Sequence, residues 1–140
     1  MKEEYVTLSQ AKKLKKLGFD WDVNKVYHRL STFSEWELFP WRSEYNDWNN
    51  EGKFHLSAPT LSLAQKWLRE KGMFLMIDPR YYQGDAVKDV KWCFIVQPLD
   101  DISGQYRSEC CGRLFDTYES ALSAGIDKAL ELLTDNQNGK

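Results

Sequence analysis

Cysteine and histidine are the side chains of this chain that could bind a metal ion or attack a substrate. The cysteines are Cys93, Cys110 and Cys111, and the histidines are His28 and His55. Structural zinc sites take their ligands from closely spaced pairs such as Cys-x-x-Cys, and the chain contains no such pair. Three cysteines, two of them adjacent, also make a poor disulfide framework. We therefore predict reduced thiols and no metal site.

Two aspartates suggest a calcium loop. The run DWDVN at residues 20–24 matches the opening of an EF-hand loop. Lys25 replaces the glycine that such a loop needs at its sixth position, and Ser31 replaces the glutamate at its twelfth. The sequence thus predicts no calcium site, and we expect Asp20 and Asp22 to cap or bridge a turn.

Three other aspartates stand at the ends of predicted strands, where catalytic carboxylates and ordinary caps both occur. These are Asp78, Asp100 and Asp101. No nucleophile elbow, metalloprotease motif, P-loop or dinucleotide-binding glycine pattern accompanies them. General acid–base and nucleophilic catalysis need groups that converge in a recognisable pattern. We predict that the protein is not an enzyme, has no catalytic residues and binds no cofactor.

Aromatic side chains dominate residues 19–56, where ten of the 38 residues are Phe, Trp or Tyr. These rings could fill the core of an irregular segment, because aromatic residues are normally at least half buried. They could also form a protein interface, since Trp and Tyr are enriched in interface hot spots. The segment has seven acidic and four basic residues, which disfavours contact with nucleic acid. For the interface, the predicted binding residues are Trp36, Trp41, Tyr45 and Trp48.

Basic residues support an alternative, in which the protein binds nucleic acid through the basic faces of predicted helices 7–17 and 60–71. The residues concerned are Lys12, Lys13, Lys16, Lys66 and Arg69. Lysine and arginine in such clusters can contact phosphates, although a charged helix face is more often simply solvated. The net charge of −2 and pI near 5.7 disfavour a broad nucleic-acid footprint.

The helices that position these groups have clear start and stop signals. Thr7 and Gln10 form a capping box, and Thr60 is placed to cap the second helix. Gly18 and Gly72 follow the last residues of these helices, where a left-handed conformation is common. A third helix begins near Asp116 or Thr117, with Asp116 and Glu119 at capping-box spacing.

Two predicted strands follow the second helix. Residues 73–78 and 91–97 are rich in apolar residues, and we expect them to pair antiparallel. Residues 19–56 have poor periodicity and predict an irregular meander in which Pro40 restricts any strand to an edge. The fold class expected is α+β, a small antiparallel sheet with about three helices in the order α-β-β-α-β-β-α.

Length and composition set the remaining expectations. A chain of 140 residues fits one domain, which we place at residues 1–134, with a flexible tail at 135–140. The N-terminus MKEEYVTLSQAKK lacks the apolar run of a signal peptide, and no segment reaches the length of a membrane helix. We expect a cytoplasmic protein that does not contact a membrane.

Three segments resemble a known group of proteins: YVTLSQAKKLKKLGFDW, SAPTLSLAQKWLREKG and FDTYESALSAGIDKALELL. The group consists of small uncharacterised proteins of phages and mobile elements of gut bacteria. The shared motifs are caps, apolar stripes and stops, and the group has no known activity. The resemblance implies a small accessory protein of a phage or an integrated element. The aromatic segment departs from the group, in which this part is often shorter.

The leading hypothesis is therefore a noncatalytic accessory protein that acts by protein–protein interaction with an unknown partner. A homodimer is also possible, because helices on one face of the sheet leave the other face to be covered. Binding of nucleic acid through the lysine-rich helices is the alternative.

A short motif occurs twice in the chain and raises the question of an internal duplication. TLSQAKKL at residue 7 and TLSLAQKW at residue 60 share the pattern T-L-S-x-A-x-K. A duplicated helix–strand–strand unit would produce this pattern, and so would two helices that are capped independently.

Overall fold

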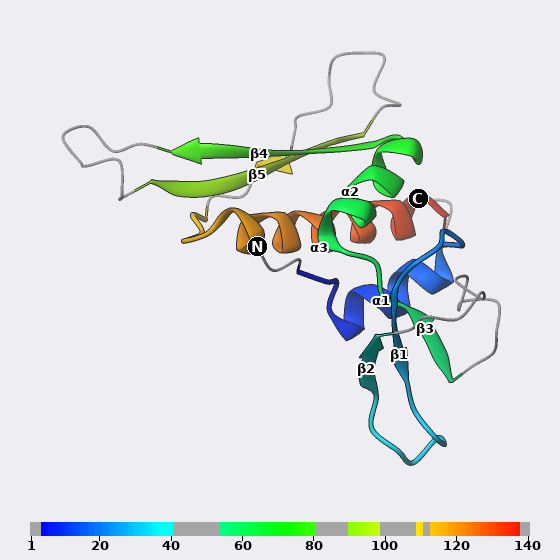
Figure 1. The fold of residues 1–140 in the computed structure, drawn as a ribbon. Helices are drawn as coiled ribbons and strands as arrows, with labels where there is room; N and C mark the ends of the chain where they lie inside the picture. Colours follow the sequence, from blue (N-terminus) through cyan, green and yellow to red (C-terminus); the bar gives the residue numbers. More distant parts are fainter. Residues whose placement is uncertain (1–3, 41–53, 81–89, 99–108, 111–112, 138–140) are drawn as a thin grey trace. The chain divides into compact units, whose positions relative to one another are not determined.

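The computed structural model describes residues 4–40, 54–80, 90–98, 109–110 and 113–137. The elements are α1 (Leu8–Lys16), β1 (Lys25–His28), β2 (Glu37–Pro40), β3 (His55–Ser57), α2 (Leu61–Glu70), β4 (Met73–Arg80), β5 (Lys91–Pro98), β6 (Glu109–Cys110) and α3 (Tyr118–Gln137) (Figure 1). They form two compact units, Met1–Ala64 and Gln65–Lys140. The α+β class predicted from the sequence is confirmed, with one more strand than expected before α2, one more after it, and two small sheets in place of one.

Helix α1 begins as its sequence predicts. The backbone N–H of Gln10 donates to the Thr7 hydroxyl at 3.2 Å, and the Gln10 side-chain oxygen accepts from the Thr7 N–H at 2.8 Å. This reciprocal pair is the capping box. The helix stops before Gly18, whose φ of 91° is in the left-handed region that glycine tolerates. Ala11 and Leu14 are fully buried, so the apolar stripe of α1 faces the core.

The first unit contains a three-stranded antiparallel sheet in the order β2-β1-β3, where we predicted an irregular meander with two strands. Tyr27 of β1 lies opposite Leu38 of β2 and Leu56 of β3. The strands have only three or four residues, and aromatic or apolar side chains occupy both faces, so they show no clean alternation. Pro40 ends β2 at the edge of the sheet, as expected for a residue that has no N–H to donate.

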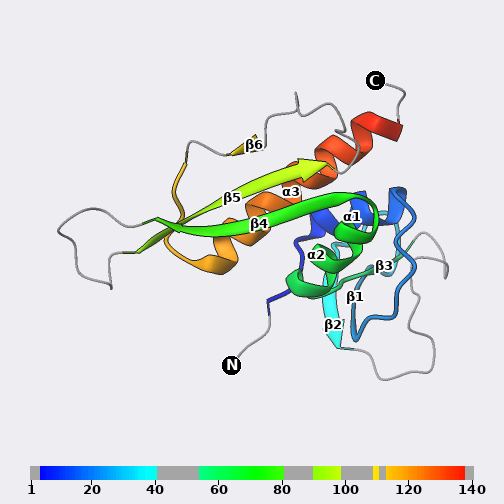
Figure 2. The same cartoon turned by 90° about the horizontal axis from the view of Figure 1, so that it is seen from above.

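The second unit contains the sheet β4-β5-β6, with α3 packed against one face of β4 and β5 (Figure 2). The predicted strands 73–78 and 91–97 are confirmed as β4 and β5, which pair antiparallel over eight residues each. Leu75 lies opposite Val96 and Ile77 opposite Phe94, on the face that contacts α3. Val96, Ile126 and Leu130 are fully buried in this core.

Threonine caps the other two helices as well. Thr60 accepts from the N–H of Leu63 at 3.1 Å, as predicted, and α2 ends at Glu70, two residues before Gly72, whose φ is 86°. Thr117 caps α3 by accepting from the Ser120 N–H at 3.0 Å. Asp116 does not form the cap that its spacing suggested, because its carboxylate pairs instead with Lys91. Helix α3 runs to Gln137, into the segment 135–140 where we expected a flexible tail.

The two units differ in topology despite their shared T-L-S-x-A-x-K motif. A threonine-capped helix precedes the three strands of each unit, and the second of these helices, α2, begins in the first unit and ends in the second. In the first unit the first strand after the helix is central, whereas in the second unit the second strand is central. This difference favours two independently capped helices over a duplicated unit.

Gly125 allows α3 to approach its sheet. A methyl group there would collide with Leu75 Cδ1 and come within 3.0 Å of Phe94 Cβ. We expect Gly125→Val to lower the free energy of unfolding by about 2–3 kcal/mol, because a branched side chain overpacks this contact. Urea denaturation would measure the change, with exposed Asp127→Ala on the same helix as a control that stays within about 0.5 kcal/mol. An unchanged stability of Gly125→Val would contradict this packing.

Candidate functional site

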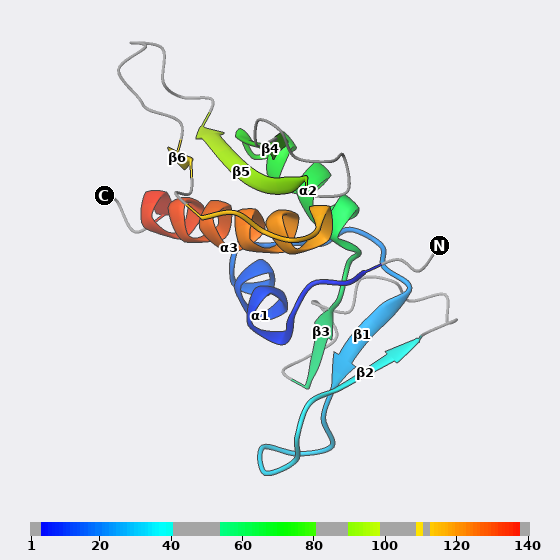
Figure 3. The same cartoon turned by 90° about the vertical axis from the view of Figure 1, so that its left-hand side faces the viewer.

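The hairpin of β1 and β2 concentrates the exposed apolar residues of the described chain. Seven large hydrophobic residues are exposed among all the described residues of the chain. Four of them lie within this hairpin: Leu30, Phe33, Leu38 and Phe39. The side chain of Phe33 is 98% exposed and that of Leu30 is 82% exposed. The loop that carries them extends away from α1 (Figure 3). Clustered exposed apolar residues of this kind mark an interaction site more often than single ones do.

Serine side chains shape the loop that presents Phe33. The hydroxyls of Ser31 and Ser34 are 3.1 Å apart, and Ser31 also accepts from the Phe33 N–H at 3.3 Å. The Ser34 N–H donates to the Ser31 carbonyl at 3.1 Å. These short-range bonds close a turn at residues 31–34, so Phe33 is held outward by local structure.

One face of the hairpin is built around Arg29. Its guanidinium lies over the ring of Trp36 at 4.6 Å and over that of Phe54 at 5.7 Å, and its backbone N–H donates to the Phe54 carbonyl at 3.3 Å. Cation–π contacts of this kind are stronger when the cation is shielded from water, and the Arg29 Nε is buried. The rings cover the positive charge, while Glu35 and Glu37 remain exposed.

The opposite face carries a second ring cluster. His28 lies directly opposite His55 in the neighbouring strand, with ring centroids 4.7 Å apart. The ring of Phe39 is 5.8 Å from that of His28. Val26 and Ser57, on the same face nearer α1, are buried. The hairpin is therefore packed at its base and exposed towards its loop.

Tyr27 anchors this sheet to the segment that precedes α1. Its hydroxyl donates to the Val6 carbonyl at 2.8 Å. Burial raises the pKa of the Tyr27 hydroxyl above its ordinary value, because desolvation disfavours the phenolate. A neutral Tyr27 is thus part of the folded state.

The structure places one of the four predicted interface residues on this surface. Trp36 is half-buried against Arg29, whereas Trp41, Tyr45 and Trp48 lie outside the described residues. Sequence reasoning missed Leu30 and three other exposed residues of the hairpin: Phe33, Leu38 and Phe39. The signal that could have found them is LSTFSE, two apolar residues in a run of turn formers.

The residues of the nucleic-acid alternative are divided between the units. Lys12 and Lys16 of α1 are exposed and Lys13 is half-buried, all in the first unit. Lys66 and Arg69 of α2 are exposed in the second unit.

Lys15, beside these lysines on α1, has a structural contact. Its ammonium donates to the carbonyl of His55 in β3 at 3.2 Å. Burial lowers the pKa of Lys15, because desolvation disfavours the charged amine. Part of the lysine cluster of α1 therefore holds the fold together.

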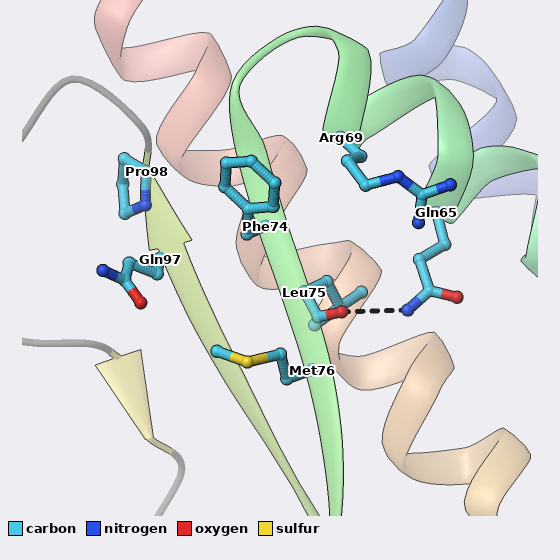
Figure 4. A pocket seen from close by; sticks show the side chains of 7 residues that line it. All are labelled: Gln65, Arg69, Phe74, Leu75, Met76, Gln97 and Pro98. Carbon is cyan, nitrogen blue, oxygen red and sulfur yellow. Dashed lines mark hydrogen bonds between the residues drawn. The ribbon is translucent and has the colours of Figure 1, made fainter.

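A groove of roughly 610 Å³ lies within the second unit (Figure 4). Its lining consists of Gln65, Arg69, Phe74, Leu75, Met76, Gln97 and Pro98. The Gln65 side-chain amide donates to the Leu75 carbonyl at 2.9 Å and so joins α2 to β4. The side chains of Phe74 and Met76 project from the face of β4 opposite α3, since neighbouring residues of a strand alternate between faces.

Metal-ligating and redox-active side chains do not converge in the described part of the chain. No group of three Cys, His, Asp or Glu residues there could hold a metal ion. Cys93 is buried, and its sulfur accepts from Arg80 Nε at 3.2 Å. Among the described residues, no helix combines the length and apolar character that crossing a bilayer requires.

Comparisons with protein-family models, curated proteins and solved structures found no match to this chain. The hairpin and the groove are therefore the candidate functional surfaces of the described chain.

We expect Tyr27 to make the stability of the protein sensitive to alkaline pH. The raised pKa means that stability is fully present below the ordinary tyrosine value of about 10 and is lost as pH rises towards the folded pKa. Tyr27→Phe should lower the unfolding free energy by about 1 kcal/mol at pH 7 through loss of its hydrogen bond. Above pH of about 10 this difference should shrink.

Urea denaturation at a series of pH values would measure this effect. Tyr118→Phe, which changes an exposed tyrosine of α3, is the matched control. A difference between wild type and Tyr27→Phe that stays constant or grows above pH of about 10 would refute the assignment.

Proposed function

We propose that the protein is a noncatalytic accessory protein that acts by protein–protein interaction through the β1–β2 hairpin. The observation that carries the proposal is the exposure of Phe33 and Leu30 on a hairpin whose base is packed. Single exposed apolar residues are common and need no explanation. Four within ten residues, on a loop fixed by its own hydrogen bonds, fit a preformed binding surface.

The charges around the hairpin define the partner that would fit it. Glu35 and Glu37 are exposed, while the rings of Trp36 and Phe54 cover Arg29. An apolar pocket with a basic rim would bury Phe33 and pair with the two carboxylates. Apolar contacts would supply most of the affinity, and the charges would orient the partner.

The biological setting rests on the sequence resemblance described above. It supports an accessory protein of a phage or a mobile element and gives no molecular role. The noncatalytic assignment rests on the absence of catalytic motifs from the sequence. A second copy of the chain is one partner to be tested, since exposed apolar residues can also support a homodimer.

We expect a photo-reactive benzoyl-phenylalanine in place of Phe33 to form one dominant crosslinked adduct in cells that naturally produce the protein. The same group at exposed Ser62, on α2, is the control and should not form that adduct. Mass spectrometry would identify the partner. An adduct with the chain itself would identify the homodimer.

Binding to the purified partner would then test the energetic role of the hairpin. Leu30→Ser should weaken binding at least about fivefold, because truncation of a buried interface anchor costs more than about 1 kcal/mol. Since Leu30 is exposed, the fold should tolerate this change. Identical adducts from positions 33 and 62, or unchanged affinity of Leu30→Ser, would refute the proposal.

The nucleic-acid alternative predicts a different result. If the hairpin proposal is correct, a 20-base-pair DNA duplex should bind no tighter than about 10⁻⁶ M at physiological salt, the upper range of nonspecific binding. Replacing both Lys12 and Lys16 with Gln should then leave partner binding unchanged. Tighter binding, lost in that variant and steeply dependent on salt, would favour the alternative. Fluorescence anisotropy would measure both properties.

A further inference from the structure

We propose that the groove of the second unit is a further protein-contact site, which binds an extended peptide segment that is both acidic and apolar. It extends the proposed interaction function to another surface, and it does not depend on the hairpin. The described residues of the groove belong to α2, β4 and β5 and lie together in one unit.

Apolar side chains form the floor of the groove. Phe74 and Met76 lie on the face of β4 opposite α3, and Pro98 of β5 lies beside them (Figure 4). Met76 is 44% exposed. Leu75 lies between Phe74 and Met76 in β4 and points to the other face, towards α3. Its side chain is close enough to Gly125 of α3 to collide with a methyl group added there. The floor can therefore accept an apolar side chain of a ligand without any change in the core.

One positive charge belongs to the described lining of the groove. Among the lining residues that the structure describes, Arg69 is the only charged one, and none of them is a carboxylate. Arg69 is exposed and forms none of the ion pairs found among the described residues. A guanidinium binds a carboxylate through two parallel hydrogen bonds. Charge complementarity therefore selects an anionic group next to the apolar one.

Three features favour a peptide over other anions. The groove is open rather than enclosed, so it can accept a chain that enters and leaves. Gln65 and Gln97 provide amides that match peptide groups. Strand β4 is at the edge of its sheet among the strands that the structure describes. Extended peptides commonly bind beside such an edge. A single cation does not match the repeated charges of a nucleic-acid backbone.

Methionine provides a direct readout of binding. The chain has three methionines, Met1, Met73 and Met76. Met76 lines the groove, and Met73 in the same strand is only 2% exposed. In NMR spectra of protein with ¹³C-labelled methionine methyls, the blocked peptide GEFELG should shift the Met76 signal saturably and leave Met73 in place. The peptide GQFQLG should bind at least about fivefold more weakly, since about 1 kcal/mol of ion pairing is lost.

Charge variants at the groove sharpen the test. Arg69→Gln and Gln97→Glu should each weaken GEFELG binding about fivefold, and Gln97→Lys should strengthen it. Lys66→Gln is the matched control, because it removes the same charge from an exposed residue of α2 outside the groove. These residues are exposed, so the fold should tolerate the changes.

Several results would overturn the proposal. An unmoved Met76 signal at millimolar peptide, equal binding of GQFQLG, or an equal effect of Lys66→Gln would each do so. Tighter binding of dodecanoate or of a DNA duplex than of GEFELG would assign the groove to a different ligand class. Phe33→Ser should leave the Met76 shift unchanged. Failure at the groove would therefore not remove a crosslink from position 33, and failure of that crosslink would not affect the groove.

Discussion

A short antiparallel ladder between residues 4–6 and residues 59–61 joins the segments that precede α1 and α2 in the first unit. The Val6 N–H donates to the Pro59 carbonyl at 3.0 Å, and the Leu61 N–H donates to the Glu4 carbonyl at 2.9 Å. Val6 and Pro59 are almost fully buried, so an unpaired peptide group there would cost about 1–3 kcal/mol. Both capping threonines adjoin this ladder. It therefore sets where α1 and α2 begin.

The same ladder supports the sheet that carries the hairpin. The Val6 carbonyl accepts from the Tyr27 hydroxyl, and the Ala58 N–H donates to the Lys25 carbonyl at 3.0 Å. Strand β1 is thus attached at its buried end to both segments of the ladder. Arg29 contacts the rings of Trp36 and Phe54, and these contacts extend the packed part of the sheet towards the loop. A loop with a rigid base can expose Phe33 without a loose backbone, which lowers the entropy lost on binding.

The parts of the fold that could be predicted from the sequence depend on local interactions. Caps are set by residues three positions apart, as Thr7 and Gln10 show, and Gly18 and Gly72 end their helices through their own backbone freedom. Prediction from the sequence fails where a contact with a distant residue determines the local structure. Thr117 and Asp116 are equally plausible caps from sequence, and the pairing of Asp116 with Lys91, 25 residues away, leaves Thr117 to cap α3.

Two strands were expected before α2, but the third strand and the ordered sheet of β1, β2 and β3 were missed for the same reason. Its register joins Val26 to Ser57 across thirty residues, and neither strand is long enough to show a period of two. From the sequence we predicted the aromatic segment as the candidate interface, with three tryptophans and Tyr45 as its binding residues. Trp36 is half-buried against Arg29, and the loop geometry exposes Phe33 instead. The exposure of a side chain in a loop depends on the direction in which the turn orients it. The amino-acid composition of the segment does not predict that direction.

The charges of the hairpin argue against a second copy as its best partner. In a two-fold dimer the same patch meets itself, and residues near the symmetry axis meet their own counterparts. A dimer that buries Phe33 at this axis would bring Glu35 and Glu37 of one hairpin towards those of the other. Like charges brought together at an interface can cost several kcal/mol, and the half-buried Arg29 already contacts the ring of Trp36. A different protein whose apolar pocket has a basic rim therefore fits the proposed hairpin interface better than a second copy does.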